Sequence, residues 1–599
     1  MSSPVRPTHV ASNGAFASWA IPAAFALILI ASTTLWLAGG VLTLLDGGQW
    51  PAGSWSLFLL IEAFTETGGL AATWPAVSPT VLIAVWVVLF LALVVPPISY
   101  LTAKVMTRPK SDAASRSLAK RSDAAFMALP ARRTQTRSLR PSLGDTPERS
   151  ITPADAGIAL GTLDSDGTPL FASWEDVIVA VMAPRSGKTT SLAIPSILNA
   201  PGPCIATSNK ADLWAATAEI REARTKQRVW TFDPQGVART DQTWWWPVLA
   251  GVKTVEEAER LAGHFVTTVE DERSRDIWGP AATELLASLV LAAAHANKPI
   301  THVYRWLSQE TNKEPDDLLH EAGFSPAADS LDGLQKSAPE TRASVFFTAR
   351  AACKCLRDPD ITAWVTPGTA TETFDPAAFV VSKQTLYLMS KDGGGSAAPL
   401  VAALVDRVLR AGVRTAEATP ASRRLDPPLV VALDEAANVA RISDLPLLYS
   451  HFGSRGILPI TILQSYAQGR AVWGDGGMKS LWSAATVKLI GAGMDDPEFA
   501  ENISKLVGDH DVSTVSVSTG QGKRNTSTSL RQQRVLTAAQ IRALPKGRAL
   551  LLATGAKPAM VQLQPFYAGP YANQISSAIT NAELVLATRS VHAETTGGR

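Results

Sequence analysis

The sequence has few cysteines and almost no excess of charge of either sign. Three cysteines, Cys204, Cys353 and Cys355, occur in 599 residues, too few and too irregularly spaced for a framework of disulfides. Cys353 and Cys355 are one residue apart and no histidine follows at zinc-finger spacing, so reduced, buried thiols are expected. The formal net charge of +2 excludes a chain that is basic throughout. Any contact with nucleic acid must therefore be local.

Charged residues are missing from two long stretches near the N-terminus. Residues 21–45 and 77–101 contain no Asp, Glu, Lys or Arg and are strongly apolar. Each is long enough to cross a hydrocarbon core of about 30 Å, which takes about 20 helical residues. We therefore expect residues 1–103 to form a membrane module with two transmembrane helices. A cleaved signal peptide and two buried helices of a soluble domain are the less favoured alternatives.

The charges beside these stretches predict their orientation. The segment between them contains Asp46, Glu62 and Glu66 but no Lys or Arg. Basic residues follow the second stretch: Lys104, Arg108, Lys110, Arg116, Lys120 and Arg121. By the positive-inside rule, both ends of the helical hairpin face the cytoplasm, and the bulk of the chain lies there with them.

The rest of the chain is too long for one core and changes character several times. Residues 104–150 are rich in Arg, Ser, Ala and Pro and predict a basic, partly disordered linker. Strand-like and helix-like segments alternate over residues 151–252 and again over 369–575, typical of two segments of one α/β domain with a parallel sheet covered on both faces. Residues 253–368 show helical periodicity, which predicts an all-helical insertion. Residues 576–599 form a polar tail, expected to be disordered at its end.

One segment of the second α/β portion has an unusual composition. Residues 512–530 are rich in Ser, Thr and Gly and include Lys523 and Arg524. This composition predicts a mobile loop. Such a loop either follows a nucleic-acid backbone or serves as a connection only.

The stretch at residues 177–190 carries the clearest chemical signal. An apolar, β-branched run ends in Ser-Gly-Lys-Thr and continues into a helix, the pattern of a phosphate-binding loop. Lys188 is expected to reach the β- and γ-phosphates of ATP, and Thr189 to bind Mg²⁺. The predicted nucleotide-binding residues are Ala183, Pro184, Arg185, Ser186, Gly187, Lys188, Thr189 and Thr190. The loop departs from the usual pattern because Met182 stands at the position of its first glycine.

A second apolar run, at residues 429–435, ends in two carboxylates. Asp434 is expected to bind Mg²⁺ together with the loop threonine, and Glu435 to orient or deprotonate the attacking water. The next apolar strand ends in Gln464, which can sense the γ-phosphate and order that water. A Gly-Lys-Thr turn without function is the alternative, and the acidic strand in the same chain makes it less favoured.

Several motifs together resemble a known family. The matching stretches are residues 208–210, 233–234, 433–446, 454–457, 463–468, 504–508 and 542–547. In these, the chain is similar to type IV secretion coupling proteins of the TraG/TraD type, over roughly residues 20–570. The resemblance implies a RecA-like P-loop NTPase domain with an all-helical insertion, preceded by an N-terminal two-helix transmembrane hairpin.

The same resemblance implies a function and a set of partners. Such proteins are ATPases of the bacterial inner membrane, anchored by more than one pass. They assemble as homo-hexamers and feed relaxase-bound single-stranded DNA, or protein effectors, to the secretion channel. ATP and Mg²⁺ are the implied cofactors. Members often carry an arginine at the position of Gly453, and in some of them it acts on the neighbouring subunit's nucleotide; here Arg455 is the nearby candidate for that catalytic role.

Three other functions remain open at this point. The chain could be a coupling ATPase for protein effectors only, an FtsK-type translocase of duplex DNA, or a membrane scaffold that recruits a relaxosome without hydrolysis. The last is compatible with the missing loop glycine at Met182.

Overall fold

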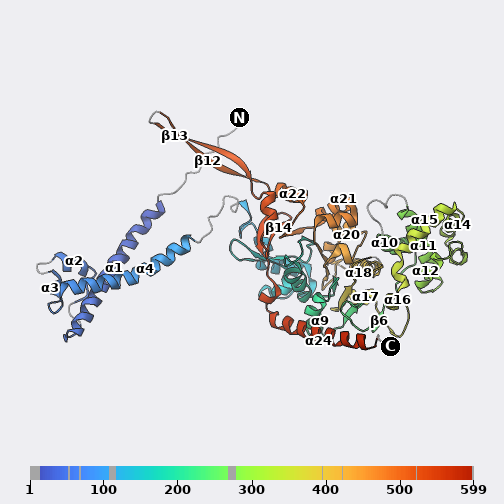
Figure 1. The fold of residues 1–599 in the computed structure, drawn as a ribbon, viewed down its shortest axis with the longest axis horizontal. Coiled ribbons are helices and arrows are strands. Elements are labelled where there is room, and N and C mark those ends of the chain that lie inside the picture. Colours follow the sequence, from blue (N-terminus) through green and yellow to red (C-terminus); the bar gives the residue numbers. More distant parts are fainter. Residues whose placement is uncertain are drawn as a thin grey trace. The chain divides into compact units, whose positions relative to one another are not determined.

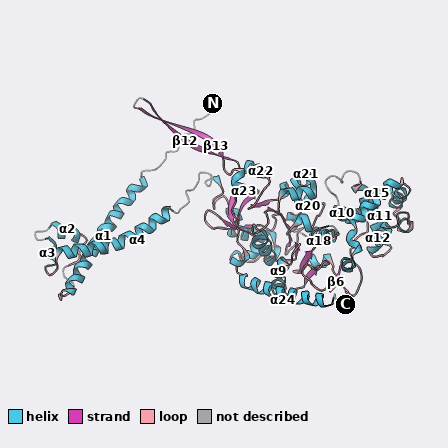
Figure 2. Cartoon of the chain, in the orientation of Figure 1, coloured by secondary structure: helices cyan, strands magenta, loops and turns pink. Residues whose placement is uncertain are grey.

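The computed structural model describes residues 14–50, 54–65, 69–106, 117–267, 278–393, 395–420, 422–520 and 523–596 (Figure 1). The chain divides into two compact units, residues 1–111 and 112–599. Figure 2 shows that the first unit is helical in its described part, whereas the second combines helices and strands.

The first unit is built on two long helices. These are α1 (Gly14–Leu45) and α4 (Pro79–Met106), with the short helices α2 (Leu59–Thr65) and α3 (Gly69–Thr73) between them. Phe25–Leu45 and Pro79–Pro97 are long and apolar enough to cross a membrane. The Trp86 indole of α4 donates a hydrogen bond to the Ala31 carbonyl of α1 at 3.1 Å. The two apolar helices that the sequence predicts are therefore present, whereas Arg108, Lys110 and Arg116, used for their orientation, lie outside the described residues.

The second unit is built on a mixed sheet of eleven strands within the described residues. In spatial order they are β2 (Pro169–Ala172), β1 (Ile158–Leu163), β15 (Ala559–Gln562), β14 (Arg548–Ala553), β11 (Val487–Gly491), β3 (Ile178–Val181), β10 (Ile457–Leu463), β9 (Leu429–Leu433), β4 (Cys204–Ser208), β8 (Thr385–Met389) and β5 (Val229–Phe232). Strands β11 to β5 are parallel, and β14, β15, β1 and β2 continue the sheet in antiparallel pairs.

Both faces of the parallel part are buried, which explains why its strands are apolar throughout. In β3, Val179 and Val181 belong to one hydrophobic core and Ile178 and Ala180 to another, since alternate side chains point to opposite faces. One face is covered by α8 (Ile194–Leu198), α9 (Asp212–Thr225) and α24 (Ala572–Thr596). The other face is covered by α17 (Pro376–Val380), α18 (Ala398–Ala418), α19 (Ala436–Val439), α20 (Leu445–Phe452), α21 (Tyr466–Ala484) and α22 (Pro497–Val507).

A group of helices is inserted in the chain between β5 and β8, and it lies at one end of the second unit (Figure 1). Its members are α10 (Val255–Val266), α11 (Gly279–His295), α12 (Thr301–Leu307), α13 (Glu314–Glu321), α14 (Ser325–Gln335), α15 (Pro339–Ala352) and α16 (Pro359–Thr362). The short strand β6 (Trp244–Trp245) precedes these helices in the chain and β7 (Glu372–Thr373) follows them, and the two strands pair with each other. No strand is described between these two. We call α10–α16 the helical insertion.

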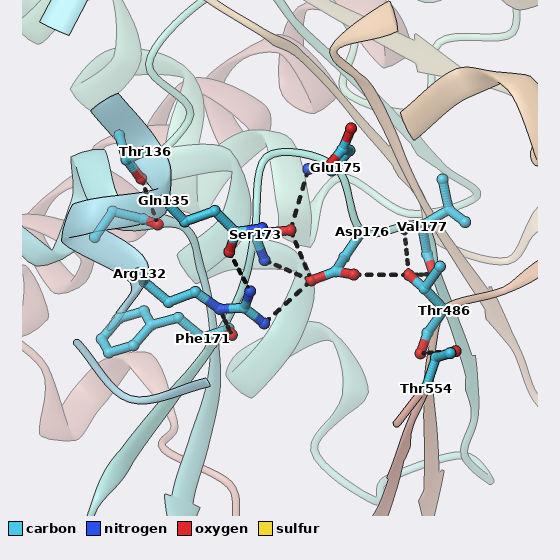
Figure 3. A network of polar contacts seen from close by, with 11 residues as sticks. Arg132, Gln135, Thr136, Phe171, Ser173, Glu175, Asp176, Val177, Thr486 and Thr554 are labelled. Atoms are coloured by element: carbon cyan, nitrogen blue, oxygen red, sulfur yellow. Dashed lines mark hydrogen bonds and ion pairs between the residues drawn. The ribbon is translucent and has the colours of Figure 1, made fainter. Parts of the chain in front are cut away.

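The predicted linker, expected to be partly disordered, has defined structure over residues 117–150, whereas residues 107–116 lie outside the described residues. This segment contains α6 (Leu129–Leu139), whose Arg132 is 4% exposed. The Arg132 guanidinium donates to the Phe171 carbonyl at 2.9 Å and to Asp176 at 3.3 Å. Figure 3 shows that Asp176 also accepts a hydrogen bond from the Thr486 hydroxyl, at 2.9 Å. Arg132, one of the arginines of the predicted linker, is therefore part of a buried network close to the first residues of β3 and β11. A buried charge needs such partners.

Two further predictions differ from the structure. Of the expected mobile loop at 512–530, the described residues belong to the strands β12 (Asp509–Gly520) and β13 (Lys523–Arg534), which pair with each other apart from the main sheet; β-branched Val and Thr favour strands. The C-terminal tail, expected to be disordered at its end, is helical up to Thr596. In the same helix α24, Ile575 and Ala578 are buried, because apolar side chains three residues apart share one face of a helix.

Candidate nucleotide-binding site

The predicted phosphate-binding loop connects β3 to a helical segment that begins at Thr189. Gly187 has a φ of 98°, in the region that favours glycine, and Arg185 has a φ of 60°. The Ser186 hydroxyl donates to the Ala183 carbonyl at 2.6 Å and closes the loop on itself. The loop therefore turns tightly from a parallel strand into a helix, and the N–H groups of such a helix start attract phosphate.

Met182 continues the strand instead of opening the loop. Its backbone N–H donates to the Leu463 carbonyl of β10 at 2.9 Å, and its side chain is buried. The Met182 side chain occupies the space above Gly491 of β11, where an added Cβ would lie 2.7 Å from Met182 Cε. The usual first glycine is thus replaced by a residue that fills the core between two strands.

The two carboxylates that follow β9 lie beside this loop. The Thr189 hydroxyl donates to Asp434 Oδ2 at 2.8 Å. The Lys188 ammonium lies 3.5 Å from Asp434 Oδ1 and forms an ion pair with Glu435 Oε1. These four residues come together because β3 and β9 flank β10 in the same parallel direction, so that their carboxyl ends meet at one edge.

Glu435 is held from several sides. Its backbone is left-handed, with a φ of 57°, a strained conformation for a residue with a side chain that persists only where neighbours impose it. Gln464 Nε2, at the end of β10, donates to Glu435 Oε2 at 2.5 Å. Asn438 Nδ2 donates to the same oxygen at 3.3 Å. Sequence reasoning found Gln464 but missed Asn438, whose signal is its position three residues after the acidic pair.

Asp434 is the most buried acid of the site, at 4% exposure. Burial raises the pKa of the Asp434 carboxyl, and the nearby Lys188 ammonium opposes this effect. Apart from the Lys188 ammonium at 3.5 Å, no group of the described residues faces Asp434 Oδ1 as a partner, and no hydrogen bond to this oxygen is formed there. A buried carboxylate oxygen without a hydrogen bond, next to a threonine hydroxyl, fits a Mg²⁺ ion, which prefers oxygen ligands. Thr189 and Asp434 are the residues that would hold it.

The site opens into a cavity of about 810 Å³, which we call the P-loop cavity. Among its lining residues are seven of the predicted nucleotide-binding residues together with both carboxylates and Gln464: Pro184, Arg185, Ser186, Gly187, Lys188, Thr189, Thr190, Asp434, Glu435 and Gln464. Ala183 is not among them; its N–H donates to the Ala492 carbonyl at 3.3 Å.

Arg455 does not line the P-loop cavity of its own chain. It follows α20 and pairs with Glu417 of α18 at 2.7 Å. Asp233, which belongs to the stretch 233–234 that resembles the family, accepts hydrogen bonds from the N–H groups of Val237 and Ala238 at 2.6 and 3.0 Å. Asp233 therefore stabilises a turn after β5.

Another part of the lining of the P-loop cavity comes from residues that carry no local motif of nucleotide binding. They are Lys546, Gly547, Leu563, Pro565, Phe566, Tyr567 and Ile579. Only Lys546 and Gly547 fell within a stretch that resembled a family motif. The others reach the cavity through the course of the chain after β15.

A phosphate-binding loop beside an acidic strand end, on a parallel sheet covered on both faces, defines the class of P-loop nucleotide-binding proteins. Residues 428–546 match the family model described as the TraM recognition site of TraD and TraG. Over 234 residues the chain is 26% identical to the conjugal transfer protein TraG of Escherichia coli, which covers 35% of this chain and 35% of TraG. The chain thus matches about a third of the length of this curated relative.

Solved structures of the bacterial conjugative coupling protein TrwB share the fold. An unbound form without its N-terminal residues aligns with a TM-score of 0.51 at 16% identity, covering 68% of this chain and 89% of that chain. A form in complex with sulphate aligns with a TM-score of 0.50 at 16% identity, covering 69% and 91%. These similarities confirm the resemblance to type IV secretion coupling proteins and the predicted fold class.

Proposed function

We propose that this chain is a membrane-anchored ATPase that recruits relaxase-bound single-stranded DNA and feeds it to a type IV secretion channel. The observation that carries the proposal is the convergence of Lys188, Asp434 and Glu435 in the P-loop cavity. The similarity to a conjugal transfer protein supports the conjugative role. TrwB itself was solved with ADP and Mg²⁺ and with an ATP analogue.

Binding of a triphosphate begins with an exchange of partners at Lys188. The Lys188 ammonium is paired with Glu435 in the structure. An incoming phosphate replaces Glu435 as the partner of this ammonium, and the backbone N–H groups of the loop bind the remaining oxygens. Bound Mg²⁺, held by Thr189 and Asp434, would neutralise part of the phosphate charge.

The exchange leaves Glu435 free to act on water. Its second oxygen stays fixed by Gln464 and Asn438, so the carboxylate is oriented when it loses the lysine. It then accepts a proton from the attacking water, while the Gln464 amide positions that water. Arg455 completes the site in a homo-hexamer by leaving Glu417 and approaching the neighbour's phosphates.

The chain segment that follows Glu435 provides a route from this site to the helical insertion. The chain from Glu435 runs through α19 to Asp444, which accepts a hydrogen bond from Arg410 of α18 at 2.8 Å. The neighbouring Ser443 hydroxyl is 2.9 Å from that of Thr267, just after α10. A shift of Glu435 during hydrolysis is thereby passed to the helices that we propose to contact the transported strand.

The first unit anchors this motor. Two apolar helices joined by a segment without Lys or Arg suit a hairpin in the inner membrane, with both ends in the cytoplasm. The second unit, with the P-loop cavity, then lies on the cytoplasmic side, where ATP and the relaxosome are found.

The test compares Lys188→Ala with Lys557→Ala, which removes a lysine of the same charge from a pair with Asp123, outside the P-loop cavity and the helical insertion. Cells carrying each variant in place of the wild-type chain serve as plasmid donors, and the membrane fraction is assayed for the protein. We expect Lys188→Ala to abolish plasmid transfer with normal membrane content, and Lys557→Ala to have no effect. Persistent transfer by Lys188→Ala refutes the motor role.

A further inference from the structure

The lining of the P-loop cavity combines two chemically different sets of residues. One set is polar and suits the phosphates; it includes Lys188, Asp434, Glu435 and Gln464. The other, which we call the apolar set, consists of Ile194, Leu213, Ala216, Leu563, Pro565, Phe566, Tyr567 and Ile579. An inorganic triphosphate would use only the polar set, so the apolar set suits an apolar part of the ligand.

The apolar set is held in place by packing. Leu563, directly after β15, is buried, and its N–H donates to the Gly547 carbonyl at 2.7 Å. Residues 563–571, which we call the strap, then lead into α24. This helix packs on α9, and α9 contributes Leu213 and Ala216 to the same cavity. The strap is thus fixed at both of its ends against elements that also shape the nucleotide site.

Tyr567 stands out within the strap because its side chain is large and 67% exposed. The centroids of its ring and of the Phe566 ring are 5.6 Å apart and the two planes lie at 74°, so the two rings are not stacked face to face. No hydrogen bond is described for the Tyr567 hydroxyl. An exposed aromatic ring at the rim of a cavity is a ready surface for stacking a flat heterocycle.

We propose that the strap forms a nucleobase subsite of the P-loop cavity, in which the Tyr567 ring stacks on the base of the bound nucleoside triphosphate. This inference rests on the proposed function, since it assigns a binding surface to the base of the same nucleotide whose phosphates the loop would bind. Lys546 also lines the cavity and is exposed, with no ion pair described for it. Its ammonium adds positive charge to this wall and favours an anionic ligand.

A neighbouring cavity of about 660 Å³ provides a matched control. It shares Pro565 and Phe566 with the P-loop cavity and is lined by Tyr571, which the P-loop cavity lacks. The Arg224 guanidinium lies over the Tyr571 ring, 5.0 Å from its centroid. Tyr571 is therefore a tyrosine of the same strap, four residues away, whose ring already has a partner.

The experiment measures binding by titration calorimetry, with the full chain in detergent micelles and Mg²⁺ present. The two ligands are a non-hydrolysable ATP analogue and inorganic tripolyphosphate. We expect Tyr567→Ala to weaken binding of the ATP analogue about tenfold, the size of one lost stacking contact, and to leave tripolyphosphate binding unchanged. Tyr567→Phe, which keeps the ring, and Tyr571→Ala should bind both ligands like the wild type.

Each contrary result has a distinct meaning. If Tyr567→Ala binds the analogue normally, or loses both ligands equally, the subsite is refuted, and the second outcome assigns Tyr567 a structural role. A loss of analogue binding in Tyr571→Ala but not Tyr567→Ala places the base in the neighbouring cavity and also refutes it. A wild-type chain that binds both ligands equally well refutes the subsite alone, whereas one that binds neither refutes the proposed function as well.

Discussion

The pairing of Lys188 with Glu435 makes a specific prediction about nucleotide affinity. Because the phosphates must displace Glu435 from the Lys188 ammonium, this ion pair competes with the ligand. The side chains of Lys188 and Glu435 are only 9% and 10% exposed, so solvent screens the pair little. Replacement of Glu435 by glutamine keeps the shape of the side chain and its acceptor for the Gln464 amide, but removes the competing charge.

The size of the effect follows from the strength of the competing contact. A hydrogen bond to a charged group contributes about 1.5–3 kcal/mol, against about 0.5–1.5 kcal/mol for a neutral one. The difference of about 1 kcal/mol predicts that Glu435→Gln binds a non-hydrolysable ATP analogue about fivefold more tightly than the wild type. The same variant should hydrolyse ATP far more slowly, because an amide cannot accept the proton of the attacking water.

The assay combines calorimetric titration of the Mg²⁺-loaded analogue with steady-state measurement of phosphate release. Glu148→Gln is the control, since it removes an exposed carboxylate that pairs with Arg137 away from the P-loop cavity. Equal or weaker analogue binding by Glu435→Gln would contradict the exchange of partners at Lys188. Wild-type turnover by this variant would contradict the role of Glu435 with water.

Three further predictions concern stability, measured as the melting transition of the full chain in detergent. Met182→Gly, which restores the usual loop residue, should destabilise the chain by about 2–5 kcal/mol because it empties a buried site; unchanged melting would refute that packing role. Gly453→Ala should lower the melting temperature, since its Cβ would lie 2.1 Å from the Glu175 carbonyl oxygen; a neutral result would contradict this close approach. Arg132→Ala should cost about 3 kcal/mol, whereas Arg137→Ala, at an exposed arginine, should change little; equal effects would argue against the buried network.

The residues of the site could be predicted from the sequence because each sits where an apolar run ends. Lys188 follows one β-branched strand, Asp434 and Glu435 follow a second, and Gln464 a third. The order of the strands in the sheet could not be predicted, since it depends on contacts between residues far apart in the chain. The structure supplies this order and places β10 between the other two strands.

The predictions for the linker, the loop at 512–530 and the C-terminal tail differ from the structure for a related reason. The composition around Arg132 is that of a solvated linker, and its partner Asp176 is 44 residues further on. Tyr567 likewise carries no motif, and its place at the cavity follows from the turn after β15. Local composition is enough to predict strands and loops that carry a chemical motif. A polar residue whose partner is distant in sequence is instead predicted to be exposed, because its contacts depend on the fold.

The most direct test of the account is ATP hydrolysis by the purified full chain in detergent, measured with and without single-stranded DNA. We predict Mg²⁺-dependent phosphate release that single-stranded DNA stimulates and that Lys188→Ala abolishes. A wild-type chain that binds ATP but never releases phosphate would contradict the claim that Lys188, Asp434 and Glu435 form a catalytic site for ATP hydrolysis. A Lys188→Ala variant that still releases phosphate would contradict it as well.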